Sequence, residues 1–211
     1  MENKKLKFSD WWHYYKGYVI AAVLIAMAVG YTIFTTVTKQ KVDMFIDCIT
    51  DSCFNASQCE QLQNDLAISG VIKDIDGDGY GIAQISSFPT GISAAEDVEA
   101  QNVEAAQIRM AIGQSPVIIT DKSVIDAYEH FEMFKDITHI TQKLGTDNVV
   151  KDKSGNVIAI CIDNSNWLNK NGIKTNGLYV TIRIPSADLK MDDMLKEQFE
   201  NADALVEYIA K

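Results

Sequence analysis

The chain has 211 residues, of which 47% are hydrophobic and 23% charged, a composition typical of one well-packed domain with a small appendage. Residues 1–41 hold six lysines and two acidic residues, a charge of +4, so the total of −10 leaves −14 on residues 42–211. Such an acidic body repels phosphate backbones, and we therefore expect no nucleic-acid binding.

Residues 17–38, GYVIAAVLIAMAVGYTIFTTVT, form an uncharged apolar run. About 20 helical residues cross the ~30 Å hydrocarbon core of a bilayer, so the run predicts a single transmembrane helix. Four lysines precede it and two follow it, which predicts that residues 1–16 are a cytoplasmic segment. Several aromatic residues of this segment suit the headgroup layer: Trp11, Trp12, Tyr14 and Tyr15.

The alternative for this run is a signal peptide that is cleaved after the small residues Ala26–Ala28. The run continues well beyond that point, which favours the membrane anchor. Both interpretations place residues 39–211 outside the cytoplasm. The first predicts a single-pass protein of the cell membrane whose span contacts the lipid bilayer.

Strands and helices are predicted to alternate along residues 39–211. Apolar alternation or short apolar runs predict strands over residues 41–50, 81–88, 116–120, 157–163 and 178–184. Helical periodicity predicts helices over residues 57–70, 93–114, 123–131 and 192–210, the first beginning with a capping box of Ser57 and Glu60. This order predicts a single α/β domain with a mostly parallel sheet and helices on both faces.

The segment KDIDGDGYGI, residues 73–82, matches part of a calcium-binding loop. Asp74, Asp76 and Asp78 occupy alternate positions that supply oxygen ligands, and Gly79 permits a sharp bend. Tyr80 follows with a backbone carbonyl that is suited to the same ion. These four ligands, from Asp74, Asp76, Asp78 and Tyr80, predict a site for Ca²⁺.

An EF-hand is excluded, because Ile85 stands where the pattern requires a bidentate glutamate. An ion here would need further ligands, for which Glu96 and Asp97 are candidates. The loop precedes a predicted strand, whereas ligand sites of parallel sheets lie at the carboxyl ends of strands, so such an ion would be structural. The alternative is a turn without an ion, because Asp-Gly pairs form tight turns unaided.

Polar residues at the carboxyl ends of the predicted strands are candidates for ligand binding: Asp51, Ser52, Ser86 and Asp121. Their alternative role is that of ordinary loop and cap residues. The sequence contains no G-x-S-x-G, no phosphate-binding loop and no H-E-x-x-H, so we expect no catalytic activity. The expected partner is a small molecule or an envelope protein.

The four cysteines, Cys48, Cys53, Cys59 and Cys161, allow three pairings in an oxidising compartment. Cys53 and Cys59 flank a short loop and are close enough in sequence to pair locally. Cys48 and Cys161 lie in apolar strand-like runs, where small buried thiols are an equal alternative.

Residues 105–138, AAQIRMAIGQSPVIITDKSVIDAYEHFEMFKDIT, resemble a helix–strand–acidic turn–helix stretch of bacterial extracellular solute-binding proteins of the type II periplasmic fold. Residues 8–16, FSDWWHYYK, resemble the segment before the span in membrane-anchored relatives of that fold. The resemblance implies a solute-binding domain, and the roughly 170 residues after the span match one lobe. The alternative is a scaffold subunit of an envelope complex without a small-molecule cleft.

Overall fold

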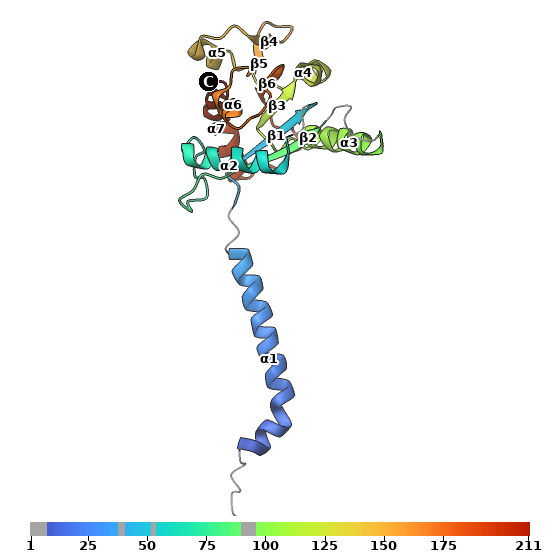
Figure 1. The fold of residues 1–211 in the computed structure, drawn as a ribbon, viewed down its shortest axis with the longest axis vertical. Helices are drawn as coiled ribbons and strands as arrows, with labels where there is room; N and C mark the ends of the chain where they lie inside the picture. The colour runs from blue at the N-terminus through green and yellow to red at the C-terminus, as the bar shows by residue number, and fades with distance from the viewer. Residues whose placement is uncertain (1–7, 38–40, 52–53, 90–95) are drawn as a thin grey trace, which may run out of the picture. The chain divides into compact units, whose positions relative to one another are not determined.

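A computed structural model describes residues 8–37, 41–51, 54–89 and 96–211 (Figure 1). The chain divides into two compact units, Met1–Gln40 and Lys41–Lys211. The first contains helix α1 (Phe8–Val37). Its segment Tyr14–Tyr31 is long and apolar enough to cross a membrane, and none of that segment is buried. The predicted apolar helix is therefore present, and it begins before residue 17.

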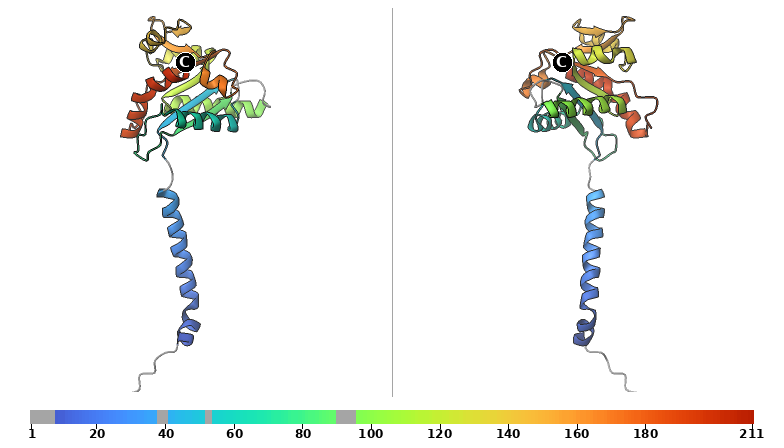
Figure 2. Two further views of the ribbon diagram at one scale, coloured as in Figure 1. Left: turned by 60° about the vertical axis from the view of Figure 1, so that its left-hand side comes forward. Right: turned by 90° about the vertical axis from the view of Figure 1, so that its right-hand side faces the viewer.

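The second unit is an α/β domain built on one six-stranded sheet (Figures 1 and 2). Its strands are β1 (Met44–Thr50), β2 (Ala83–Pro89), β3 (Val117–Asp121), β4 (Val149–Lys151), β5 (Val157–Cys161) and β6 (Leu178–Ile182). Its helices are α2 (Ala56–Ser69), α3 (Glu96–Ile112), α4 (Lys122–Tyr128), the 3₁₀ turn η1 (Glu129–Phe131), α5 (Thr138–Leu144), α6 (Asn166–Lys170) and α7 (Asp193–Ile209).

The sheet is mixed, so the prediction of a mostly parallel sheet is wrong. Its strand order is β2-β1-β3-β6-β5-β4. Strand β1 pairs in parallel with β2 and β3, whereas the pairs β3–β6, β6–β5 and β5–β4 are antiparallel. The helical crossovers α2 and α3 make the first half parallel, as predicted. The second half differs because the link between β4 and β5 is too short for a crossover and forms a hairpin.

The two faces of the sheet bury different sets of side chains. Residues alternate between the faces along each strand, so Ile46 and Cys48 lie on one face and Asp47 and Ile49 on the other. We call the face that carries Ile46 the closed face, because α2, α6 and α7 pack a large apolar cluster onto it. The opposite face, here the open face, carries a smaller cluster beneath α3 and α4.

The capping box of helix α2 lies two residues earlier in the chain than predicted. The side chain of Asn55 accepts the Gln58 N–H at 2.9 Å, and the Gln58 side chain accepts the Asn55 N–H at 3.0 Å. The predicted capping box of Ser57 and Glu60 is therefore wrong. The capping residue is Asn55, whose side chain satisfies a free backbone N–H of the first helical turn. Gly70 ends the helix in the left-handed conformation, as predicted.

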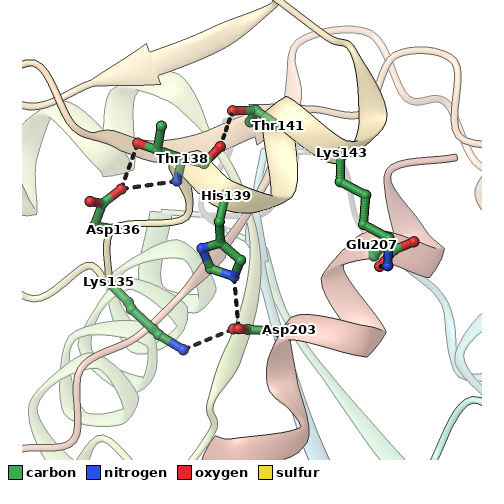
Figure 3. A network of polar contacts seen from close by, with 8 residues as sticks. All are labelled: Lys135, Asp136, Thr138, His139, Thr141, Lys143, Asp203 and Glu207. Carbon is green, nitrogen blue, oxygen red and sulfur yellow. Dashed lines mark hydrogen bonds and ion pairs between the residues drawn. The ribbon is translucent and has the colours of Figure 1, made fainter.

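Polar contacts fasten α7 to α5 and to the segment before it (Figure 3). Lys135 Nζ and His139 Nε2 each lie 2.8 Å from a different carboxylate oxygen of Asp203. Burial alone would raise the pKa of Asp203, but the hydrogen bonds from Lys135 and His139 outweigh burial and lower it. Lys143 contacts Glu207 one turn further along α7. This network stabilises the packing of α7.

Two of the described cysteines, Cys48 and Cys59, belong to the closed face. Cys48 is fully buried in the apolar cluster, and burial raises the pKa of its thiol well above the usual value. Cys59 is half-buried and packs against the same cluster, and Cys161 is half-buried in β5. Cys53 lies outside the described residues. Cys48 is thus packed as a small buried hydrophobe, one of the two roles expected of it.

Candidate functional site

Two of the four predicted ligand residues meet at the carboxyl ends of β1 and β3. Asp51 follows β1 directly and Asp121 ends β3. The Asp51 backbone N–H donates to Asp121 Oδ2 at 2.5 Å. Just beneath, the hydroxyl of buried Thr120 donates to the Ile49 carbonyl at 2.6 Å. These two bonds hold the ends of the neighbouring strands together.

A third predicted residue, Ser86, does not join them. Ser86 lies in the middle of β2 opposite Asp47 in the sheet register, so the expectation that it ends a strand is wrong. Asp51 lies four residues beyond Asp47, roughly 13 Å along the strand direction. The predicted strand over residues 81–88 already extends past Ser86, and β2 ends at Pro89. Ser52 lies outside the described residues.

The chain leaves β1 and β3 over opposite faces of the sheet. The connection α2 after β1 packs on the closed face, whereas α4 after β3 packs on the open face. The carboxyl ends of β1 and β3 therefore flank a topological switch point, where the two connections diverge. Open α/β sheets bind ligands preferentially at such points.

A cavity of about 640 Å³ lies between α3 and α4, on the open face and next to this switch point. Its walls are largely apolar and include Val103, Ala106, Met110, Val124, Ala127 and Tyr128. Ile49 of β1 contributes to its lining, and Asp51, Gln107 and Ser123 supply polar groups. We call it the α3–α4 cavity. Its volume lies within the range of about 300–1,000 Å³ that is typical of small-molecule sites.

Burial changes the pKa of Asp121, which precedes α4 and accepts the Asp51 N–H. Its pKa is raised, first by burial and also by the nearby charge of Asp51, although the N–H of Asp51 opposes the shift. Two carboxyl groups thus lie close together where water is partly excluded.

The only two arginines of the chain, Arg109 and Arg183, lie near a buried carboxylate on the open face. Arg109 Nη2 lies 3.1 Å from Asp47 Oδ1, and its guanidinium lies 5.6 Å from the centre of the Phe88 ring. Burial raises the pKa of Asp47, although Arg109 and Arg183 oppose the shift. These three residues form a buried charge cluster with one excess positive charge.

Arg183 is the less satisfied of the two arginines. Both arginines have a buried Nε without a hydrogen-bond partner among the described residues, but Arg109 is paired with Asp47, whereas Arg183 is 3% exposed and has no such ion pair there. Burial lowers its pKa. Gly113 closely abuts it, because a Cβ at that position would lie 2.8 Å from Arg183 Nε. Sequence reasoning missed the cluster, although an aspartate in the apolar run MFIDCIT and an arginine in LYVTIRI were its visible signs.

The aspartate loop, residues 73–82, leads from α2 into β2 and lies at the amino ends of β1 and β2, where it was expected. Asp74 accepts the backbone N–H groups of Gly77 at 2.7 Å and Gly79 at 2.8 Å. The Gly79 bond is the main cause of the lowered pKa of Asp74. Asp78 accepts the Tyr80 N–H at 2.9 Å. The aspartates therefore organise the loop through the backbone.

One carboxylate that the sequence did not indicate joins the loop. Asp43, just before β1, is 1% exposed and accepts the N–H groups of Ile75 and Ile82, each at 2.8 Å. Carboxylate oxygens of Asp43, Asp74 and Asp76 all lie within 4.8 Å of one another, a spacing suited to one cation. Asp78 is not part of this group of three. The side chains of Glu96 and Asp97 lie outside the described residues.

A second cavity, of about 430 Å³, lies beside η1 and the β4–β5 hairpin. Its lining mixes charged groups, including Glu129, Glu132 and Lys153, with the apolar Phe134 and Ile158. Two of its carboxylates already serve local turns, since Asp136 accepts the Thr138 N–H and Asp152 accepts the Asn156 N–H. It lies away from the ends of β1 and β3.

No protein-family model, curated protein or solved structure matches this chain.

Proposed function

We propose that the protein is a single-pass, membrane-anchored binding domain without catalytic activity, in which α1 crosses the cell membrane and residues 39–211 lie outside the cytoplasm. The apolar segment Tyr14–Tyr31 supports the anchor, and the four lysines before it against two after it support the orientation. The likeness of residues 105–138 to solute-binding proteins supports a binding role on one lobe of that fold. Protease added to intact spheroplasts should digest the domain, and protection would contradict the orientation.

The observation that carries the binding role is the coincidence of the α3–α4 cavity with the switch point between β1 and β3. Cavities of this size and apolar character usually hold small molecules. The rigid sheet positions Ile49 and Asp51 at the cavity, and the helices supply its walls. We therefore propose that a small molecule binds between α3 and α4.

The binding role is tested by methyl NMR of the full chain in phosphatidylcholine nanodiscs with isotope-labelled methionine methyl groups. Met110 lines the cavity, whereas Met44 is buried on the closed face and is the internal control. Titration with phenylbutanol, a neutral apolar probe, should shift the Met110 methyl resonance and leave that of Met44 unchanged.

Cavity filling supplies the matched control for this titration. Ala127→Trp should abolish the Met110 shift, because Ala127 is an exposed helical residue that lines the cavity. Ala67→Trp, at an exposed position of α2, should keep the shift. An unchanged response in Ala127→Trp would contradict binding in the cavity.

A second function is favoured by apolar residues that α3 and η1 expose. Ile108 is 49% exposed, Ile112 is 43% exposed and Phe131 is 61% exposed. Such residues suit contact with another protein of the cell envelope, which is the scaffold role. If no apolar probe shifts Met110 while Ile108→Ser together with Ile112→Ser abolishes a cross-link to an envelope protein, the scaffold role replaces small-molecule binding.

We also propose that the aspartate loop binds a structural Ca²⁺ ion. Carboxylate oxygens are the ligands that calcium prefers, and Asp43, Asp74 and Asp76 bring three together. The backbone carbonyl of Tyr80 and the carboxylate of Asp78 remain candidates for further ligands. Such an ion would tie the amino ends of β1 and β2 together.

A further inference from the structure

We infer that the buried guanidinium of Arg183 binds a small monovalent anion, for which chloride is the probe. The inference goes beyond the proposed small-molecule function, because it concerns a different point on the open face and does not depend on the α3–α4 cavity. It combines a buried cation that has no ion pair, one excess positive charge in the surrounding cluster, and a glycine that leaves part of the guanidinium uncovered.

Arg183 carries a charge that burial makes costly. The residue is 3% exposed, and an arginine side chain stays protonated in proteins, so its charge persists inside the domain. Buried charges in proteins are normally paired or hydrogen-bonded. Within the described part of the chain, Arg183 forms no ion pair and its Nε has no acceptor. A buried donor of this kind is typically satisfied by a bound ion or water.

Asp47 does not neutralise Arg183, because it is already engaged by Arg109. Arg109 Nη2 lies 3.1 Å from Asp47 Oδ1. Burial raises the pKa of Asp47, and Arg109 and Ser115 are the first groups that oppose the shift. Burial also lowers the pKa of Arg183, which Asp47 opposes only at longer range than an ion-pair contact. Two guanidinium groups against one carboxylate leave one positive charge, which one monovalent anion would balance.

The surroundings of Arg183 suit a small ion. A Cβ on Gly113 would lie 2.8 Å from Arg183 Nε and 3.0 Å from its Nη2, so glycine leaves this side of the guanidinium without a covering side chain. Arg183 lines neither of the two cavities described above, which favours an ion over an organic ligand of the size that those cavities hold. Arg109 Nε is a second buried N–H of the same cluster without an acceptor in the described structure.

The experiment observes the guanidinium groups directly, because the chain contains only two arginines. The full chain, with nitrogen-15-labelled arginine, is placed in phosphatidylcholine nanodiscs, and Arg109→Met assigns the Nε–Hε resonance of Arg183. Chloride then replaces gluconate, a large organic anion, at constant ionic strength. We expect a saturable downfield shift of the Arg183 Hε resonance, half complete at roughly 10–100 mM chloride, because hydrogen bonds between charged groups are the stronger class. Arg109 should shift less, because Asp47 pairs with it.

Thermal unfolding tests whether the anion binds the folded domain. Chloride in place of gluconate should raise the Tm of the full chain by about 2–4 °C. Arg183→Met should abolish this rise. Lys174→Met removes one positive charge at an exposed position and should keep it. Gluconate alone supplies no small anion, and in that buffer Arg183→Met should cost no stability.

Three results would overturn the inference. An equal shift of the Arg183 resonance when sulfate or gluconate raises the ionic strength would identify charge screening instead of binding. A shift of the Arg109 resonance without one of Arg183 would place the anion elsewhere. Unchanged resonances of both arginines in chloride would rule out the anion. If Arg183→Met does not fold, the titration of the wild-type chain decides by itself.

Discussion

The closed and open faces of the sheet bury side chains in different ways. On the closed face, α2, α6 and α7 contribute Leu66, Leu168 and Leu205 to a continuous apolar cluster, and each of these is fully buried. On the open face, α3 and α4 cover a smaller cluster, a buried charge cluster and a cavity. The comparison indicates that one face supplies stability, while the other gives up close packing at a potential binding site.

The largest expected effect distinguishes the cores of the two faces. Leu205→Ala should lower the free energy of unfolding by about 3–4 kcal/mol, because it opens a void in a closed apolar cluster. Met110→Ala should cost about 1–2 kcal/mol, because Met110 already borders a cavity and its truncation enlarges existing space. Urea unfolding of the full chain measures both, and equal costs would contradict the distinction between the faces.

The two arginines should respond differently to the same substitution. Arg109→Met removes the ion pair of Asp47 and should cost about 2 kcal/mol. Arg183→Met removes a buried cation whose Nε lacks a partner, and should leave stability unchanged or raise it by up to about 1 kcal/mol. Thermal unfolding measures both changes. An equal loss of stability in Arg183→Met and Arg109→Met would mean that Arg183 has a stabilising partner and would contradict this difference.

Calcium should stabilise the aspartate loop at the amino ends of β1 and β2, independently of the packing on either face of the sheet. Millimolar Ca²⁺ should raise the Tm by about 3 °C relative to a chelator, by the same amount in Leu205→Ala and Met110→Ala. Asp43→Asn should remove the response, whereas Glu60→Gln on α2 should keep it. A Tm that is identical with calcium and with chelator would rule out the ion and leave the loop as a turn.

The smallest expected effect concerns the polar contacts of α7 on the closed side. The pKa of Asp203 is lowered in the folded protein, so its contribution is present above its unfolded value near 3.8 and is lost as the pH falls through the folded value. Asp203→Asn should therefore cost less than about 1 kcal/mol at pH 7, because the carboxylate is partly exposed and solvent screens it. The cost should vanish at the lowest pH at which the protein stays folded, and a pH-independent cost would contradict the role of the charge.

The sequence predicted the helices and strands that show a periodic pattern of apolar residues within their own segment. The alternation of residues 178–184 gave strand β6, and the spacing of apolar residues in 192–210 gave helix α7. Strand β4 was missed because three residues are too few to show a period. The place of β6 beside β3 was also missed, because strand order depends on contacts that sequence periodicity does not encode.

The candidate site was predictable where it depended on strand ends. Asp51 and Asp121 end neighbouring parallel strands, so simple topology brought them together. Asp43 and the cluster around Asp47 come from residues that are distant in sequence and meet only in the folded domain. The cavity depends on how far α3 and α4 stand apart, which no local pattern records.

Intermolecular nuclear Overhauser effects between phenylbutanol and the methionine methyl groups test the central claim most directly. We expect contacts from the aromatic ring of the probe to the Met110 methyl and none to the Met44 methyl. Met27, an exposed residue of α1, reports partition into the lipid. Contacts to Met27 without contacts to Met110 would contradict a binding site between α3 and α4.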